Sequence, residues 1–309
     1  MKQNLFFIYF LNLFLFTPIH SQLMRTYEYY TDLWQQDMIP LEYPAYHLLK
    51  KNPILTNVNY LAIPWAYLID TNRLDLVPKI KLNGGFTITR SVHFEKLFPI
   101  LSEIGINVIF TPHATLKEYK SIKVLPMPHF NLNGTLPNKN KDIFYSFIGC
   151  EDNPLRKKIF RAKHSKKAVI IKRKTLHFYI DIWEKSQEAK IRKEQEKIEY
   201  QNILSRSRFS LCPNGRGPGT LRFWESLQAG AIPVLIECNL ALPSGFDWES
   251  CIVKISEIDI NNISEILTSI SQDQEAKMRK KCLRAHKLFS NNNLIKVIKN
   301  YYENNIITN

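Results

Sequence analysis

One stretch of the chain constrains its fold more than any other, the segment SLCPNGRGPGTLRFWESLQAGAIPVLI at residues 210–236. An apolar run ends at Pro213, and a glycine-rich turn follows it. A helical pattern then runs over Thr220–Ala229 and ends at Gly230, before a second apolar run, Ile232–Ile236. This order of strand, glycine turn, helix and strand predicts a βαβ unit whose helix points its N-terminus toward a ligand.

The glycine turn has the chemistry of an anion site. Gly215, Gly217 and Gly219 have no side chain, so the backbone there can approach a ligand closely. Thr220 stands at the expected start of the helix, where its hydroxyl can bond a free backbone amide. The free amides and the helix dipole at such a terminus favour an anion such as a diphosphate.

Two charged residues follow on the same predicted helix. Arg222 and Glu225 are three positions apart and share one helix face, where Arg222 can neutralise a phosphate and Glu225 can accept hydrogen bonds from a ribose. The turn matches neither the GxxxxGK[ST] loop of NTPases nor the GxGxxG turn of dinucleotide folds. A structural alternative stays open, in which the turn only holds a buried Arg222–Glu225 salt bridge.

Length and composition fit two globular domains, with 309 residues that are 45% hydrophobic and 23% charged. The formal net charge of +14 favours anionic partners. The basic run at residues 156–174 lacks the interleaved aromatic residues of an RRM and the repeated stacking residues of single-strand binders, so no nucleic-acid partner is expected. It is either an ordinary solvated helix face or a peripheral contact with an acidic membrane surface.

Apolar and helical segments alternate along the chain, which predicts an α/β arrangement. The polar stretch at 131–142 is rich in Asn, Gly and Pro and marks a boundary between domains at 24–135 and 136–309. The elements expected after it are a strand at Ile143–Cys150, a helix from about Pro154, a strand at Ala168–Lys172, a helix at Trp183–Ser207 and a strand at Arg208–Cys212. Ligands of such open sheets lie at the carboxyl ends of the strands.

The first residues, 1–23, form a possible signal or anchor segment, because Lys2 precedes an apolar run at Leu5–Phe16. A buried first strand and an internal start at Met24 are the alternatives. The localisation is therefore left open between cytoplasmic, membrane-associated and secretory. The five cysteines form no CxxC pair, which argues against a disulfide framework or a zinc ribbon and favours buried thiols.

The segment SRFSLCPNGRGPGTLRFWESLQAGAIPVLI, followed by LPSGFDWESCIVKISE, resembles the C-terminal signature of the exostosin family of glycosyltransferases. Order and spacing are kept from Ser207 to Glu257. Two upstream segments, YSFIGCEDNPLRKKIF and IIKRKTLHF, resemble further motifs of the family. The resemblance implies a GT-B-like α/β fold, with two Rossmann-like domains facing across a cleft. Domain 136–309 would bind a nucleotide sugar, and domain 24–135 would face the acceptor.

The resemblance also implies donor-binding roles for Asn214, Gly215, Gly217, Thr220, Arg222, Glu225 and Arg156. The turn residues would cradle the diphosphate and Arg222 would offset its charge. Glu225 would hold the ribose, and Arg156 would be a second phosphate contact. The chain departs from the family pattern at Asn214, where many members have arginine, at Ser244-Gly245 in place of phenylalanine, and at Leu176 in place of tryptophan.

The reaction implied is an inverting transfer of a sugar from a UDP-linked donor to a hydroxyl of a glycan or glycolipid. Loop amides, helix dipole and Arg222 could stabilise the leaving diphosphate without a metal ion, so no metal or other cofactor is expected. The nearest candidates for a cation site do not fit: Asp70 and Asp75 have the wrong spacing, and Glu257–Asp259 lies in a strand-like run outside the glycine turn and is better explained as ordinary surface carboxylates.

A general base should come from the first domain. Asp70 and His113 both end strand-like segments and are weak candidates, and the catalytic residue stays unassigned. The alternative function is a catalytically inactive module of the same fold that binds a glycan or a nucleotide.

Overall fold

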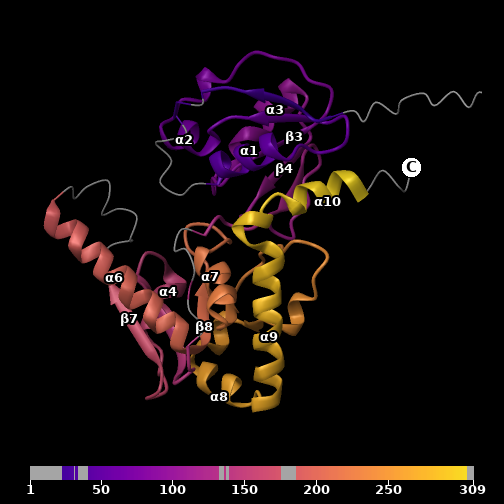
Figure 1. Ribbon diagram of the computed structural model, residues 1–309. Coiled ribbons are helices and arrows are strands. Elements are labelled where there is room, and N and C mark those ends of the chain that lie inside the picture. Colours follow the sequence, from indigo (N-terminus) through magenta and orange to yellow (C-terminus); the bar gives the residue numbers. More distant parts are fainter. Residues whose placement is uncertain are drawn as a thin grey trace, which may run out of the picture.

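The computed structural model describes residues 23–30, 32–33, 41–131, 136, 139–174 and 186–304. Within these ranges the chain forms two α/β units, the upper and lower parts of the ribbon in Figure 1. The expected leader, the exact domain boundary near residue 135 and the departure at Leu176 lie outside the described residues.

The first unit is built on one parallel sheet with strands in the order β1-β2-β3-β4-β5. Its elements are β1 (Arg25–Glu28), α1 (Glu42–Lys51), β2 (Asn59–Ala62), α2 (Trp65–Asp70), β3 (Phe86–Ile88), α3 (Phe98–Ile104), β4 (Val108–Thr111) and β5 (Lys123–Pro126), with short 3₁₀ turns at Leu74–Leu76 and Phe94–Leu97. Alternate strand residues face opposite sides, so Tyr60 and Phe86 pack with α1 while Leu61 and Ile109 pack with α2 and α3. Helices therefore cover both faces of this sheet.

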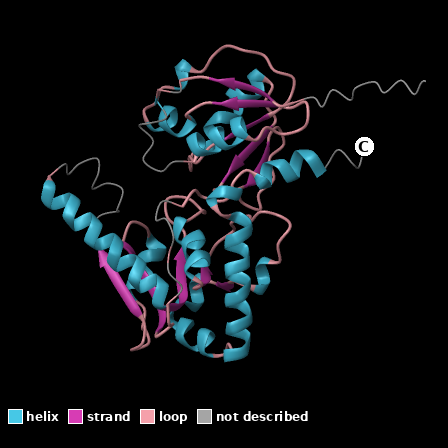
Figure 2. Cartoon of the chain, in the orientation of Figure 1, coloured by secondary structure: helices cyan, strands magenta, loops and turns pink. Residues whose placement is uncertain are grey.

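The second unit has its own parallel sheet, in the order β10-β9-β8-β6-β7. Its elements are β6 (Ile143–Cys150), α4 (Pro154–Arg161), β7 (Val169–Arg173), α6 (Gln187–Arg206), β8 (Ser207–Pro213), α7 (Leu221–Ala229), β9 (Ile232–Ile236), β10 (Val253–Ile255), α8 (Ile263–Thr268) and α9 (Gln272–Phe289), with 3₁₀ turns at Trp248–Ser250 and Glu257–Asn262. Figure 2 shows the strands of each unit flanked by helices. The predicted α/β class, with two Rossmann-like sheets, is confirmed.

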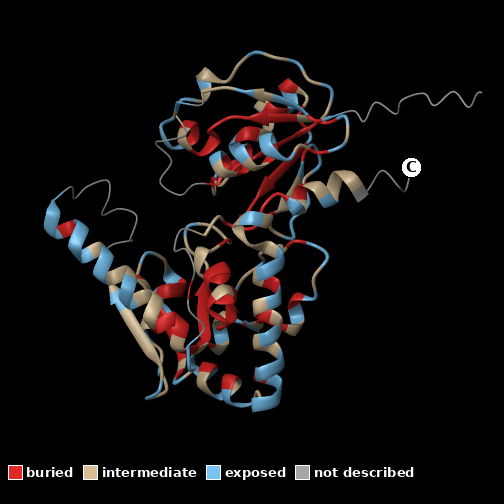
Figure 3. Ribbon diagram, viewed as in Figure 1, coloured by how far each residue is buried: buried red, intermediate tan, exposed pale blue. Residues whose placement is uncertain are grey.

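Burial on both faces of the sheet explains why the sequences of the central strands are unbroken apolar runs. All five residues of β9 are buried, and the buried residues of Figure 3 follow the strands and the helix faces against them. A parallel strand covered on both sides has no solvent face, so its pattern is continuous rather than alternating. Phe209 and Val234 are fully inaccessible at the centre of this core.

The C-terminal segment returns to the first unit. After α9 and a 3₁₀ turn at Asn291–Asn293, helix α10 (Lys296–Asn304) lies beside the upper part of the ribbon in Figure 1. Leu294, Ile295 and Ile298 are buried in the same cluster as Tyr60 of β2. The tail of the predicted second domain therefore packs in the core of the first unit.

Several predicted elements are confirmed with their bounds. Ile143–Cys150 and Ile232–Ile236 are strands, a helix starts at Pro154, and Gly230 ends α7 with a positive φ of 63°. Glycine adopts this left-handed conformation with less strain than any residue with a side chain, which is why the helix ends at Gly230.

Three local predictions were wrong. Ser207 belongs to β8 rather than to the preceding helix, because it pairs with Ile143 of β6 in the sheet and its hydroxyl can donate to Ser146 of the same strand. Asp70 ends helix α2 rather than a strand, since the buried Glu42 carboxylate accepts the Ala66 amide in the first turn of that helix. Residues 257–259 form a 3₁₀ turn, not a strand.

Four of the five cysteines are buried and Cys238 is half-buried, all as free thiols, as predicted. In the part of the chain that the structure describes, no helix combines the length and apolar character needed to cross a membrane.

Candidate active site

The glycine turn connects the carboxyl end of β8 to helix α7, as the sequence predicts. Thr220 is the N-cap residue, but its side chain makes no capping hydrogen bond, which corrects the expected role of its hydroxyl. Its carbonyl oxygen instead accepts the Phe223 amide at 3.2 Å. Within the turn, the Gly215 amide donates to the Gly217 carbonyl at 3.2 Å. The loop is therefore folded partly upon itself.

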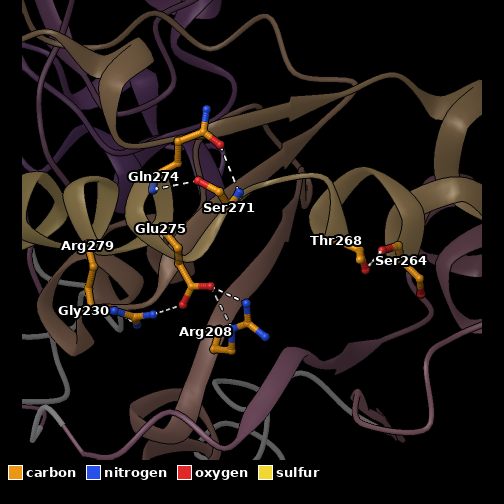
Figure 4. Close-up of polar contacts among 8 residues, drawn as sticks. All are labelled: Arg208, Gly230, Ser264, Thr268, Ser271, Gln274, Glu275 and Arg279. Atoms are coloured by element: carbon orange, nitrogen blue, oxygen red, sulfur yellow. Dashed lines mark hydrogen bonds and ion pairs between the residues drawn. The ribbon is translucent and has the colours of Figure 1, made fainter.

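The far end of α7 is fixed by a charged network. Figure 4 shows Glu275 of α9 between Arg208 of β8 and Arg279 of α9, and both arginines donate to its carboxylate. Arg279 also donates to the Gly230 carbonyl at 2.8 Å, the residue that ends α7. Because α7 packs on α9 and its C-terminus is tied to this network, the helix is held firmly behind the glycine turn.

Helix α4 holds the same turn from the other side. Its N-cap Asn153 donates to the Asn214 and Gly215 carbonyls at 3.1 and 3.3 Å. Arg156 Nε donates to the Asn214 carbonyl at 3.2 Å, and its Nη1 pairs with Asp152 at 3.0 Å. These bonds use the backbone of Asn214, so the departure from arginine at this position does not remove them.

The two arginines of the predicted donor site lie close together. The Arg222 guanidinium stands 4.6 Å from the centre of the Phe147 ring, and that of Arg156 stands 5.9 Å from it. Arg222 also donates to the Ile148 carbonyl near the carboxyl end of β6. Burial and the nearby Arg222 charge lower the pKa of Arg156 below its ordinary value. Two guanidinium groups therefore lie side by side at the carboxyl edge of the second sheet.

Glu225 lies on the same side of α7 as Arg222, because both contact Tyr200 of α6. The Tyr200 hydroxyl donates to Glu225 Oε2, and its ring centre is 5.7 Å from the Arg222 guanidinium. Glu225 is buried. Burial and the Glu225 charge raise the pKa of Tyr200 well above its usual value, so its phenol stays protonated.

The glycine turn also contacts the first unit. His113, which follows β4, accepts the Gly219 amide at its Nδ1, 3.2 Å away. A β-carbon on Gly219 would stand 2.1 Å from the Pro112 carbonyl oxygen, and one on Gly217 would stand 2.7 Å from Val92. Glycine is needed at these positions for the approach of the two units.

Two buried histidines lie at this contact. The rings of His113 and His129 meet edge to face, 5.2 Å apart. Burial and the nearby Arg90 charge lower the pKa of His113 to about 4, and burial lowers that of His129 as well. Neither ring nitrogen of His129 has a hydrogen bond of ordinary geometry, although the Gly219 backbone lies near it.

The acidic candidates lie apart from the glycine turn. Asp70 is half-exposed and lies 3.8 Å from Arg90, which brings it to the same side of the first unit as His113. Glu257 pairs with Lys158 at 2.6 Å, as an ordinary surface carboxylate does. Among the described residues, no group of three or more His, Cys, Asp or Glu side chains is placed to hold a metal ion.

Comparison with known proteins assigns the chain to a family. Residues 106–270, more than half of the sequence, match the model of the Exostosin GT47 domain. The chain belongs to the exostosin GT47 family. The glycine turn, α7, α4, His113 and Tyr200 all lie inside the matched segment, whereas Asp70 lies before it.

Similar curated proteins share this part of the exostosin GT47 chain. An Exostosin-1 homolog of Caenorhabditis elegans is 36% identical over 88 residues, 28% of this chain and 23% of that protein. A "Probable glycosyltransferase" of Arabidopsis thaliana is 35% identical over 95 residues, 30% of this chain and 18% of that protein. A "Probable glucuronosyltransferase" of Oryza sativa is 38% identical over 76 residues, 24% of this chain and 18% of that protein. The chain therefore matches less than a quarter of the length of these relatives.

Solved structures resemble the exostosin GT47 chain more distantly. WaaG, a glycosyltransferase involved in lipopolysaccharide biosynthesis, matches with a TM-score of 0.41 at 9% identity, over 90% of this chain and 97% of that one. TarM matches with a TM-score of 0.43 at 12% identity, over 84% of this chain and 57% of that one. The fold itself is established by the two parallel sheets.

Sequence reasoning missed three residues of the site. Asn153 had a usable signal, since an asparagine directly before Pro154 at the first helical position is a typical N-cap. Tyr200 and His129 had none, because the residues that they meet, Glu225 and Gly219, are 25 and 90 positions further along the chain.

Proposed function

We propose that this chain is a glycosyltransferase that moves a sugar from a UDP-linked donor to a hydroxyl of a glycan or glycolipid. The observation that carries the proposal is the pair of guanidinium groups, Arg222 and Arg156, against Phe147 beside the glycine turn. Family membership supports the reaction class, and relatives in that family carry glycosyltransferase names.

A diphosphate fits this charge distribution. Arg156 has one carboxylate neighbour, Asp152, and Arg222 Nε is buried with no hydrogen-bond partner among the described atoms. Guanidinium groups bind phosphate oxygens through paired donors, and charge-assisted bonds of this kind are stronger than neutral ones. Both arginines also lie at carboxyl ends of parallel strands, where ligands of such sheets bind.

The proposed chemistry is a single displacement. The acceptor oxygen attacks the anomeric carbon while the bond from that carbon to the diphosphate breaks, which inverts the configuration. Arg222 and Arg156 would offset the charge that develops on the leaving group, so we propose no metal requirement. The acceptor proton would pass to a base on the first unit, for which Asp70 is more exposed than His113.

The test is a thermal-shift screen of the full chain with UDP, GDP, ADP and CMP. We expect UDP at about 100 times its dissociation constant to stabilise the fold by roughly 2.7 kcal/mol. Arg222→Ala and Glu225→Ala should abolish the shift. Arg284→Ala, an exposed arginine of α9, should keep it. Equal shifts in all four proteins, or none with any nucleotide, would exclude the donor site.

One observation favours a second candidate, an inactive binding module. The Gly219 amide is already bonded to His113, and Gly217 packs on Val92, so part of the turn serves the contact between the units. Release of UDP from a UDP-sugar in the presence of a glycan acceptor separates the two candidates. Contact with an acidic membrane through the basic run at residues 156–174, and a part in polysaccharide biosynthesis, stay predictions.

A further inference from the structure

One side chain from a distant part of the chain touches both charged residues of α7. Tyr200 lies on α6, and its hydroxyl donates to Glu225 Oε2. The same ring stands 5.7 Å from the Arg222 guanidinium, which rests on Phe147 at 4.6 Å. The Arg222 guanidinium thus lies near two aromatic rings, those of Phe147 and Tyr200, and the Tyr200 hydroxyl binds the Glu225 carboxylate.

The chemistry of this contact fixes an orientation. A carboxylate offers about four lone-pair positions, and a phenol that donates to one oxygen leaves the others aimed in defined directions. Glu225 is only 5% exposed, so its carboxylate depends on fixed partners and cannot exchange them freely for water. Without the phenol, the carboxylate loses a donor that water replaces poorly in a buried site.

We propose that Tyr200 is a positioning residue for the donor nucleotide. Its hydroxyl holds the Glu225 carboxylate in the orientation that accepts ribose hydroxyls, while its ring, which Tyr200→Phe retains, stays beside Arg222. Tyr200 thereby sets the preference of the site for a ribonucleotide over a deoxynucleotide. This inference rests on the proposed function, because it assigns the ribose to Glu225.

The chain offers a matched control for this contact. Tyr119 in the first unit also donates to a glutamate, Glu95, with its hydroxyl at 2.7 Å. Tyr119→Phe removes the same atom from the same kind of pair, away from the glycine turn. The Tyr119–Glu95 pair is exposed whereas Glu225 is buried, so Tyr119→Phe controls for the loss of a tyrosine hydroxyl as such, and the cost of the buried site is measured by the melting temperature of Tyr200→Phe.

The experiment measures calorimetric affinities of the full chain for UDP, 2′-deoxy-UDP and 3′-deoxy-UDP. We expect the wild type to bind UDP about tenfold more tightly than at least one deoxy form. Tyr200→Phe should weaken UDP binding about tenfold and leave that deoxy form bound as before, so that the preference disappears. Tyr119→Phe should keep the wild-type preference.

The outcomes separate the inference from the function beneath it. If Tyr200→Phe keeps the ribose preference, or weakens all three nucleotides equally, Tyr200 is only structural and the inference fails while the donor site stands. If the wild type binds no nucleotide, the donor site fails and the inference falls with it. A melting temperature measured beside each titration shows whether the variant is folded.

Discussion

At the scale of single residues, Gly219 shows what the absence of a side chain achieves. An alanine β-carbon there would stand 2.1 Å from the Pro112 carbonyl oxygen and 3.0 Å from His113 Nδ1. Because the nearer atom belongs to the backbone, it cannot move aside cheaply. We expect Gly219→Ala to lower the free energy of unfolding by about 2 kcal/mol, as overpacking does elsewhere. Urea unfolding measures this.

Gly215→Ala is the matched control for that substitution. A β-carbon at Gly215 meets only the end of the Arg156 side chain, at 3.2 Å, and that side chain can shift. Hydrogen exchange of the turn should speed up in Gly219→Ala, since the bond from its amide to His113 is lost. Equal unfolding free energies in the two variants would show that the contact between the units carries little stability.

The same residues mark the limit of reading the turn from sequence. Spaced glycines predict a close approach of a ligand to the backbone, and at Gly217 and Gly219 the structure brings residues of the first unit close to it. The partner His113 is 106 positions away in the chain. A local pattern of glycines indicates that the backbone must be approached closely, but it does not identify the group that approaches.

At the scale of elements, one buried carboxylate, that of Glu275, links α9 to β8. Glu275→Gln removes the charge that pairs with Arg208 and Arg279 and leaves two cations side by side. We expect a loss of about 3 kcal/mol in the free energy of unfolding, because removing the carboxylate leaves both arginines without the negative charge that pairs with them. Lys277→Gln removes an exposed charge from the same helix and should change stability by less than about 0.5 kcal/mol. Comparable midpoints in urea for both variants would contradict this.

The bounds of helices and strands were predictable where a glycine, a proline or a capping residue marks the end of the element. The strand at Ile232–Ile236 follows the helix stop at Gly230, and α4 begins at a proline after its asparagine cap. The junction of α6 and β8 carries neither glycine nor proline, so the helix was extended one residue too far. Its end is set by pairing with β6, through Ser207 and Ser146, which is a tertiary contact.

At the scale of the whole molecule, the chain crosses between the two units in ways that no local pattern records. Helix α10 joins the core of the first unit although it follows α9 of the second. A second contact joins the units where the Ala241 amide donates to the Ala114 carbonyl at 2.9 Å. Composition and the alternation of apolar and helical segments predicted two α/β units. The contact between the units could not be predicted in this way, because it depends on residues more than a hundred positions apart.

Acidification should weaken this contact. His113 has a pKa of about 4 in the folded chain, against an ordinary value of 6.5 in the unfolded one, because burial disfavours its charged form. Between those values the unfolded state binds more protons than the folded state. The contribution of His113 to the free energy of unfolding is therefore fully present above about pH 6.5 and is lost as the pH drops toward 4. For His113 the loss approaches about 3 kcal/mol. The lowered pKa of His129 adds in the same direction.

Urea unfolding at pH 7, 5.5 and 4.5 tests this, with variants to separate the histidine from the acidic groups that also titrate. His113→Asn offers an amide oxygen to the Gly219 amide but no proton-binding site, so its stability should fall less steeply than that of the wild type over this range. His93→Asn, at an exposed position, should follow the wild-type profile. If His113→Asn and the wild type lose stability in parallel, the buried imidazole does not couple pH to the contact between the units, and the acid sensitivity belongs to the carboxylates.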